Sequence, residues 1–381
     1  MDFKEIIGQT QVKAHLLDAL KNGRIAHAQL FLGTPGSGSL PMALAYAELI
    51  VAHIKKGEWV DEPDESAILK SRKLVHPDIH FVFPVNKTEN IKPKYPISND
   101  FIELFRKKIG QNPYVNLNEW YNFIGMGNSQ GLISVSESAN ILKKLSLKPY
   151  ESDFKVMIIW MPEQMNIPAS NKILKILEEP PAKTLFILAS EDSDKLISTI
   201  TSRCQLVKLD ALTDSEIAQG LVDKTDINVE SAKSIAHLSS GNFNRALELI
   251  KHGEAGNTNQ EEFVTWMRLC FSKDVGELLK WGEKMARTNR ENLKLFFEYA
   301  LHMFRESLIM NYADDSLLRL EGSEKAFAKK FAPFINQANC VAMILEFETA
   351  SANIQRNANA KILLFDLSIQ VMKLIRVKPS N

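Results

Sequence analysis

The apolar positions in the first half of the chain alternate between short continuous runs and longer segments with apolar residues three and four positions apart. The short runs are typical of parallel strands covered on both faces, and the longer segments are typical of the helices that cover them. The pattern predicts strands at 28–32, 78–85, 132–135, 155–160, 184–190 and 205–209. Strands that alternate with helices indicate an α/β domain with a mainly parallel sheet, which we place at residues 1–210.

Capping signals mark two helices of this domain. Asn166 precedes an apolar periodic segment, and we expect a helix from there to Glu178, where two prolines follow and end it. Ser136 is expected to cap a helix that extends to about residue 147.

Residues 86–130 have a different character. They combine prolines, several asparagines and scattered aromatic residues, including Trp120 and Tyr121. We interpret this stretch as an insertion between core elements, with one helix at 101–109.

The strand signal stops after residue 209. Thr213 and Glu216 form a capping box, S/T-x-x-E, that opens the first of three helices, and residues 211–252 read as a small helical unit. A polar, glycine-containing stretch at 251–259 is a linker signal. Beyond it the pattern is helical throughout, which predicts a separate all-helical domain at 260–381.

The composition narrows the class of protein. At 381 residues the chain is long enough for two or three domains, and its 45% apolar and 24% charged content is normal for a globular protein. The net charge is zero, so the chain as a whole carries no electrostatic argument for binding nucleic acid or a membrane. The three cysteines are far apart in the sequence, which fits a reducing cytoplasm and predicts neither disulfides nor a zinc site. No run of apolar residues is long enough to span a membrane.

A glycine loop follows the first strand and resembles a phosphate-binding loop. Gly33 and Gly38 have the spacing of the G-x-x-x-x-G-K-[ST] pattern, and Gly36 lies between them. Such a loop turns backbone N–H groups toward a phosphate at a helix N-terminus. However, Ser39 stands where the phosphate-binding lysine is expected, and Leu40 where the magnesium-binding hydroxyl is expected. Without further context, an ordinary strand–helix turn explains the glycines as well.

The carboxylates of a nucleotide-hydrolysing site normally follow the next buried strand. Here Trp160 and Met161 occupy those positions. Glu163 comes two residues further along the chain, and its side chain should point elsewhere. The lysine, the hydroxyl and both acids are missing together. We therefore expect no ATP hydrolysis and no functional ATP site in this chain.

Several segments together resemble the AAA+ clamp-loader subunits of bacterial DNA polymerase III, and the delta-prime type in particular. They are Ile7-Gly8-Gln9, residues 24–33, the sequence Leu-Glu-Glu-Pro-Pro at 177–181, and Ser202-Arg203-Cys204. Weaker similarity continues at 241–247 and 354–359. The resemblance implies an AAA+-like domain with P-loop NTPase topology, a three-helix lid and an all-α collar.

The resemblance also bears on metal binding and on the insertion. Members of the family often carry a four-cysteine zinc module after the phosphate-loop helix, but residues 56–78 hold no cysteine, so no zinc is expected. The insertion at 86–130 has no counterpart in the resemblance.

By the same resemblance, the chain is a non-catalytic subunit that helps to load the sliding clamp on primed DNA. Its partners are gamma/tau and delta type subunits, the clamp and, through the complex, DNA. Arg203, flanked by Ser202 and Cys204, is implied to reach the nucleotide of a neighbouring motor subunit. An arginine supplied in trans can raise the rate of phosphoryl transfer by orders of magnitude. The alternatives are an active motor subunit of the gamma/tau type, or a purely structural scaffold in which Arg203 is only a surface ion pair.

Four other residues are weaker candidates for function. Arg245 lies in the segment that resembles the sensor-2 helix, and Ser190 ends a strand at the sensor-1 position. We expect Arg245 to form a structural ion pair here and Ser190 to be structural as well. Lys172 and Lys175 are expected to face solvent rather than DNA.

Overall fold

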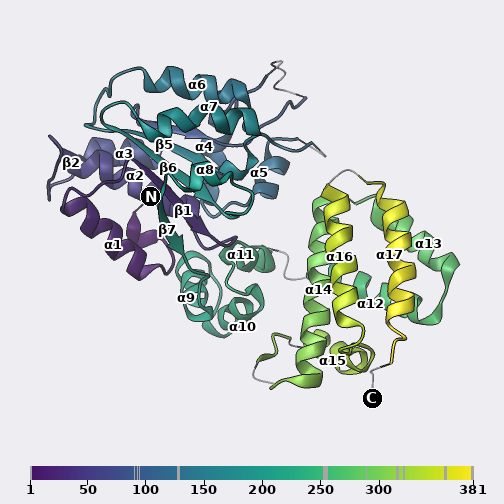
Figure 1. Ribbon diagram of the computed structural model, residues 1–381. Coiled ribbons are helices and arrows are strands. Elements are labelled where there is room, and N and C mark those ends of the chain that lie inside the picture. The colour runs from purple at the N-terminus through teal and green to yellow at the C-terminus, as the bar shows by residue number, and fades with distance from the viewer. Residues whose placement is uncertain are drawn as a thin grey trace. The chain divides into compact units, whose positions relative to one another are not determined.

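The computed structural model describes residues 2–89, 91, 93, 95–126, 129–251, 256–288, 290–314, 317–320, 322–355 and 358–378. The chain divides into two compact units, Met1–Glu248 and Leu249–Asn381, which are described separately (Figure 1). The predicted linker at 251–259 and the motif at 354–359 lie partly outside the described residues, at 252–255 and 356–357.

Unit 1 is built on a five-stranded sheet with the strand order β4-β5-β6-β1-β7, of which β5, β6, β1 and β7 are labelled in Figure 1. Its strands are β1 (Ala28–Gly33), β4 (Ile79–Val82), β5 (Lys155–Trp160), β6 (Thr184–Ser190) and β7 (Gln205–Leu209). All neighbouring strands pair in parallel, which confirms the predicted α/β class. The carboxyl ends of all five strands therefore lie at one edge of the sheet, where ligands bind in such folds.

Helices cover both faces of the sheet. The helices of unit 1 before the lid are α1 (Thr10–Lys21), α2 (Ser39–His53), α3 (Glu65–Arg72), α4 (Ile102–Gln111), α5 (Leu117–Phe123), α6 (Val135–Leu145), α7 (Ile167–Glu178) and α8 (Ser198–Thr201), with short 3₁₀ turns η1 (Phe3–Glu5), η2 (Ser98–Phe101) and η3 (Pro162–Gln164). Successive strand residues point to opposite faces. Phe31 and Trp160 thus join the core under α1, α2, α4 and α5, whereas Leu30 and Ile159 join the core under α6, α7 and α8.

Some predicted boundaries are wrong, for local reasons. The predicted strand at 132–135 is only two isolated bridges, Val85 to Leu132 and Ile133 to Met165, and the helix that follows starts at Val135, so that Ser134 rather than Ser136 precedes it. The second predicted strand is shortened to β4, since Pro84 has no N–H to donate to a ladder.

The helix after the glycine loop ends earlier than expected. The sequence pattern suggests an end near Gly57, but α2 stops at His53 and a small hairpin follows, β2 (Ile54–Lys55) and β3 (Glu58–Trp59). Gly57 sits in the turn at a φ of +84°, a backbone conformation that glycine adopts at little cost.

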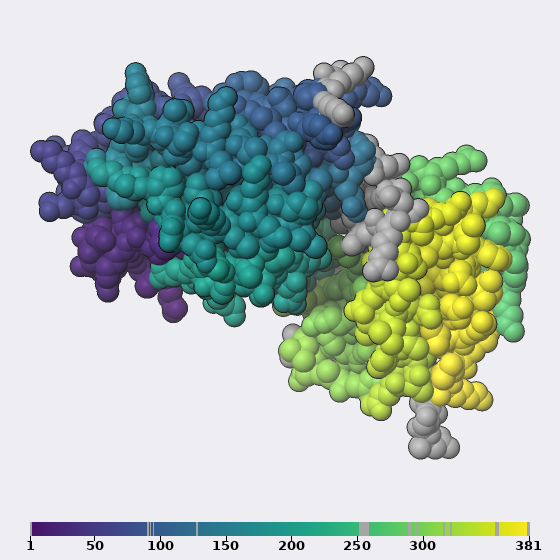
Figure 2. Space-filling model, turned by 45° about the horizontal axis from the view of Figure 1, so that its top comes forward, coloured from purple at the N-terminus to yellow at the C-terminus, as the bar shows by residue number. Residues whose placement is uncertain are grey.

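The insertion packs into unit 1. It contains α4 and α5, of which sequence analysis predicted only the first, and its coloured atoms belong to the continuous surface of the unit (Figure 2). The Phe105 ring from α4 stacks on Phe83 at 4.1 Å between centroids and meets Trp120 of α5 edge-on at 5.6 Å. The same ring lies 6.1 Å from Trp160 at the end of β5. The insertion thus caps the end of β5 with aromatic side chains.

The three predicted lid helices follow β7 as α9 (Asp214–Lys224), α10 (Val229–Ser239) and α11 (Phe243–Lys251). The capping box is present: Thr213 Oγ1 accepts from the Glu216 amide at 3.2 Å, and the Glu216 carboxylate accepts from the Thr213 amide at 2.8 Å. Asn166 caps α7 in a similar way, through the amide of Ala169 at 2.9 Å.

Within its described residues, unit 2 contains helices joined by loops and no strand. It contains α12 (Gly256–Ser272), α13 (Val275–Ala286), α14 (Arg290–Tyr312), α15 (Gly322–Phe331), the turn η5 (Ala332–Phe334), α16 (Cys340–Gln355) and α17 (Ala360–Leu374). Aromatic rings fill its core, with Trp266 stacked on Trp281 at 5.0 Å and meeting Phe347 edge-on at 5.7 Å. No helix among the described residues is long and apolar enough to cross a membrane.

The position of Trp160 leads to a stability prediction. Trp160→Asp places at this site the residue type that a nucleotide-hydrolysing relative would carry, but here the side chain is 1% exposed and packed against Phe105. We expect unfolding free energy to fall by roughly 4 kcal/mol or more, because a buried ring is lost and a carboxylate is left without a partner. Trp160→Phe, the control, costs about 1–2 kcal/mol. Equal urea-unfolding curves for the two variants would contradict this.

Candidate functional site

The glycine loop lies at the carboxyl edge of the sheet, between β1 and α2. Its backbone reaches conformations that favour glycine, with a φ of +77° at Gly36 and +101° at Gly38. The helix then begins directly at Ser39. The strand, loop and helix are therefore arranged as in a phosphate-binding loop, and what surrounds them decides whether a nucleotide fits.

The lid contacts the first half of the loop, at Gly36. A Cβ at Gly36 would lie 2.0 Å from Oδ1 of Asn242, so only glycine fits beneath the lid at this point. The amide of Phe243, the first residue of α11, donates to the Gly36 carbonyl at 3.4 Å. The lid thus contacts the loop directly, with no room for a ligand between Gly36 and Asn242.

The insertion covers the second half of the loop. The ring of Tyr114, a residue between α4 and α5, lies 3.2 Å from where a Cβ at Gly38 would be. Its hydroxyl accepts a hydrogen bond from the Ile7 amide at 2.8 Å, and its ring meets Phe243 edge-on at 5.0 Å. Only 4% of Tyr114 is exposed. Burial raises the pKa of its hydroxyl far above the ordinary value, so the ring is neutral.

The N-terminal motif Ile7-Gly8-Gln9 holds the loop from the other side. Gln9 Nε2 donates to the Ser37 carbonyl at 3.2 Å and to the Asp210 carbonyl at 2.7 Å, which ties the loop to the end of β7. Gly8 has a φ of +57° and packs so close to Glu216 that a Cβ would lie 2.4 Å from its carboxylate. The motif therefore joins the loop, β7 and α9.

The residues of the loop do not fit a magnesium nucleotide. Ser39 and Leu40 are 5% and 2% exposed, and neither supplies the positive charge that a triphosphate needs. The hydroxyl of Ser37 is buried without a hydrogen-bond partner among the described residues, but it points toward Gly33, where a Cβ would lie 2.2 Å from it. With Asn242 and Tyr114 seated on the loop, the space and the charge for phosphates are both missing.

The strand end expected to carry acids is apolar. Trp160 and Met161 are 1% and 2% exposed, and Met161 takes a left-handed conformation with its amide bonded to the Ala189 carbonyl at 2.9 Å. Glu163 points instead to the end of β6, where it accepts from Ser190 Oγ at 2.8 Å and from the Glu191 amide at 3.0 Å. Sequence reasoning placed Ser190 at this edge but gave no sign of its partner.

Glu163 of η3 and Glu191, which directly follows β6, hold protons at higher pH than usual. Burial raises the pKa of Glu163, and burial together with the nearby Glu163 carboxylate raises the pKa of Glu191 to about 8. A protonated carboxyl is a poor ligand for Mg²⁺, which is bound in proteins by ionised carboxylates together with water and phosphate oxygens. Across the described residues, no three metal-binding side chains come together.

Arg203 lies outside this closed site, after α8 and just before β7. Its guanidinium forms an ion pair with Glu178, the first glutamate of Leu-Glu-Glu-Pro-Pro, and donates to the Thr199 carbonyl at 2.9 Å. The Arg203 side chain is 30% exposed. Burial raises the pKa of the neighbouring Cys204 thiol to about 11, so Cys204 is not a reactive thiolate.

The remaining candidates have no role at the loop. Lys172 and Lys175 are exposed on α7, as expected for a solvated face. Within the part of the chain that is described, Arg245 forms no ion pair; its amide donates to Asn242 Oδ1 at 3.0 Å. The ion pair expected for Arg245 is therefore not seen there.

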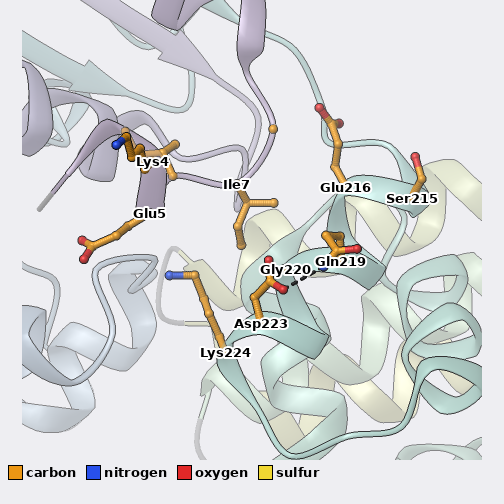
Figure 3. Close-up of a pocket in the computed structure, with 11 residues that line it drawn as sticks. Lys4, Glu5, Ile7, Ser215, Glu216, Gln219, Gly220, Asp223 and Lys224 are labelled. Atoms are coloured by element: carbon orange, nitrogen blue, oxygen red, sulfur yellow. Dashed lines mark hydrogen bonds between the residues drawn. The ribbon is translucent and has the colours of Figure 1, made fainter.

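An open hollow of about 460 Å³ lies between the N-terminal segment and α9 (Figure 3). Its charged lining is mixed, with Lys4 and Lys224 beside Glu216 and Asp223, and Gln219 already donates to Asp223 at 2.7 Å. Ile7 extends into it and packs against Gly220 of α9. The hollow has no single charge and none of the glycine loop, so it is not a second phosphate site.

A parallel sheet of this order, a glycine loop after β1 and three helices after the last strand define an AAA+-like domain. Residues 8–213 match the family model described as DNA polymerase III, delta subunit. This match covers more than half of the chain, which therefore belongs to that family of clamp-loader proteins.

Curated relatives carry several subunit names. The chain is 27% identical to DNA polymerase III subunit delta' of Bacillus subtilis, over 65% of this chain and 60% of the relative. It is also 27% identical to subunit tau of the same organism, over 82% and 50%, and to subunit gamma of Buchnera aphidicola, over 66% and 58%. The chain thus spans about half to three fifths of the length of these relatives, and identity does not separate the subunit types.

Solved structures with a similar arrangement include the RuvB Holliday junction branch migration motor of Thermotoga maritima, at 18% identity, with 68% of this chain and 65% of that chain covered and a TM-score of 0.40. A DNA polymerase III gamma subunit-related protein of the same organism covers 95% and 99% at 14% identity and a TM-score of 0.36. Scores this low carry no argument about function.

The raised pKa of Glu191 leads to a pH prediction. The folded state keeps a proton on Glu191 up to about pH 8, whereas the unfolded state loses it near 4.5. The folded state thus binds more protons between these values, and stability falls as pH rises through this window. Glutamine cannot titrate in this window. We therefore expect the unfolding free energy of Glu191→Gln to fall by at least about 1 kcal/mol less than that of the wild type by pH 8, as measured by urea unfolding at several pH values.

The exposed neighbour of Glu178 gives a matched control for this experiment. Glu179→Gln removes an exposed carboxylate at the end of α7, and we expect it to leave the pH dependence unchanged. An unchanged slope for Glu191→Gln as well would show that Glu191 titrates normally.

Proposed function

We propose that the chain is a non-hydrolysing clamp-loader subunit of the delta-prime type. It works in the cytoplasm as part of the DNA polymerase III assembly, together with gamma/tau and delta type subunits, and it helps to load the sliding clamp on primed DNA. It binds neither ATP nor zinc. Its contribution to catalysis is Arg203, which completes the ATPase site of a neighbouring subunit.

The filling of the glycine loop by the chain itself is the observation that carries this proposal. Asn242 covers Gly36, Tyr114 covers Gly38, and Trp160 closes the strand end with the aromatic residues of the insertion. A subunit that hydrolyses ATP needs this space open and charged. The closure favours the delta-prime type over the gamma and tau relatives, which are equally similar in sequence.

Arg203 is suited to act in trans because it is held loosely. The pair with Glu178 is partly exposed on both sides, with side-chain exposures of 30% and 46%. Exposed pairs of this kind contribute about 0–1 kcal/mol, less than the gain when an arginine meets a developing phosphoryl charge. The guanidinium can therefore exchange Glu178 for a phosphate group at a subunit boundary without a large cost.

The purely structural scaffold is the second candidate. It is favoured by the same closed loop, because a filled site needs only to support the fold. The two candidates differ in what Arg203 does in the assembled loader, since a scaffold uses Arg203 only for its surface ion pair with Glu178.

The substitution Arg203→Ala separates the two candidates. In the loader reconstituted with its partner subunits, we expect ATP turnover with clamp and primed DNA to fall at the one site that Arg203 completes, by roughly 10³-fold at that site. Gel filtration is expected to show normal assembly, because a surface ion pair adds little stability.

Arg24→Ala is the matched control, since Arg24 also pairs with a nearby carboxylate, Asp18, at 2.8 Å on the surface. It should leave both assembly and turnover unchanged. Full turnover of the Arg203→Ala complex would favour the scaffold and overturn the proposed trans role.

A further inference from the structure

The side chain of Tyr114 joins three parts of unit 1 that are distant in sequence. It contacts the N-terminal segment at Ile7, the glycine loop at Gly38 and the lid at Phe243. Residues 7 and 114 are 107 positions apart, yet they share a buried hydrogen bond of 2.8 Å. This one side chain thus fills the space between the loop, the lid and the N-terminal segment.

The surroundings of the Tyr114 ring have the character of a ligand site. Small-molecule sites are mostly apolar, with a few placed polar groups that fix orientation. Here the ring lies between a glycine, which lets it approach the backbone, and an aromatic side chain, Phe243. A single backbone N–H, that of Ile7, fixes its polar end. Such a site accepts a planar ring with a hydrogen-bond acceptor on one edge.

The residues on either side of Tyr114 fasten it to the lid. Asn112 Oδ1 accepts from the Tyr114 amide at 2.9 Å, and Asn112 Nδ2 donates to Oδ1 of Asn244 at 3.1 Å. Both asparagines are buried, at 9% and 2% exposure. Asn116 Nδ2 donates to the carboxylate of Glu248 at 3.1 Å. Segment 112–116 therefore lies along α11 and contacts it at three points, counting the ring of Tyr114 on Phe243.

We propose that Tyr114 is a ligand carried within the chain: it occupies a ring-binding site formed by the N-terminal segment, the glycine loop and the lid, and it holds α11 against the loop. A diffusible ligand stabilises a closed lid only in proportion to its concentration. A ligand that is part of the chain does so at all times. The lid of this subunit is therefore fixed independently of nucleotide. This inference rests on the proposed non-hydrolysing role but not on Arg203.

The test removes the ring and then supplies it from solution. In the full chain, Tyr114→Ala is expected to lower the unfolding midpoint by roughly 5–10 °C and to speed amide hydrogen exchange in α11 at least tenfold. 4-Methylphenol, which has the shape of the tyrosine side chain, should raise the midpoint of this variant saturably and slow the exchange again. The wild-type chain should not respond to it.

Tyr121→Ala is the matched control. Tyr121 is another tyrosine of the insertion, 9% exposed, that packs on Gly131 rather than on the loop. We expect this variant to lose stability without faster exchange in α11. Equal exchange in α11 for the two alanine variants, or no saturable effect of 4-methylphenol on Tyr114→Ala, would overturn the inference.

Tyr114→Phe keeps the proposal testable if the alanine variant does not fold. It retains the ring and loses only the acceptor for the Ile7 amide. We expect faster exchange at Ile7 and unchanged protection of α11; unchanged exchange at Ile7 would contradict the bond. Because these measurements use the isolated chain, they are independent of whether Arg203→Ala affects the assembled loader.

Discussion

The contact between the ring of Tyr114 and the backbone at Gly38 is the constraint on which the rest of the site depends. A glycine is required there because its φ is +101° and because a Cβ would press on the ring. Once the ring is seated, the lid rests on it through Phe243 and the N-terminal segment through Ile7. The glycine loop therefore serves as a packing surface for the chain itself. In place of a charged, open cradle, the edge of the sheet is covered by side chains from the insertion and the lid.

The same constraint accounts for the residues that replace the acids. Trp160 is an aromatic partner for Phe105, which also packs on Phe83 and Trp120. The insertion thus contributes a ring over the loop and a group of rings over the strand end, with Phe105 and Trp120 in α4 and α5 and Tyr114 in the stretch between them. The insertion therefore contacts both Trp160 at the strand end and Gly38 in the loop. Arg203 makes its ion pair with Glu178 and is not among these contacts.

Local features were predictable from the sequence because their causes are local. Asn166 and the pair Thr213 and Glu216 cap the helices that their spacing indicates, and the apolar runs at β5 and β6 form buried parallel strands. The glycine loop between a strand and a helix was also predictable, since Gly33 and Gly38 lie in one short stretch of sequence. The role of the insertion could not be predicted. Tyr114 and Phe105 are unremarkable in sequence, and their partners are brought to them only by the folded sheet and lid. The short strand expected at 132–135 failed for a similar reason, because only two of its residues find bridge partners.

Nucleotide binding by the isolated full-length chain tests the central claim most directly. Isothermal titration calorimetry with ATP and Mg²⁺ measures it without partner subunits, so no neighbouring ATPase site can contribute to the heat. Because Tyr114 and Asn242 occupy the glycine loop and no lysine follows Gly38, the account predicts no saturable heat of binding up to millimolar ATP. Saturable, magnesium-dependent binding at micromolar ATP would contradict it, since the nucleotide would then have displaced the chain's own side chains from the loop.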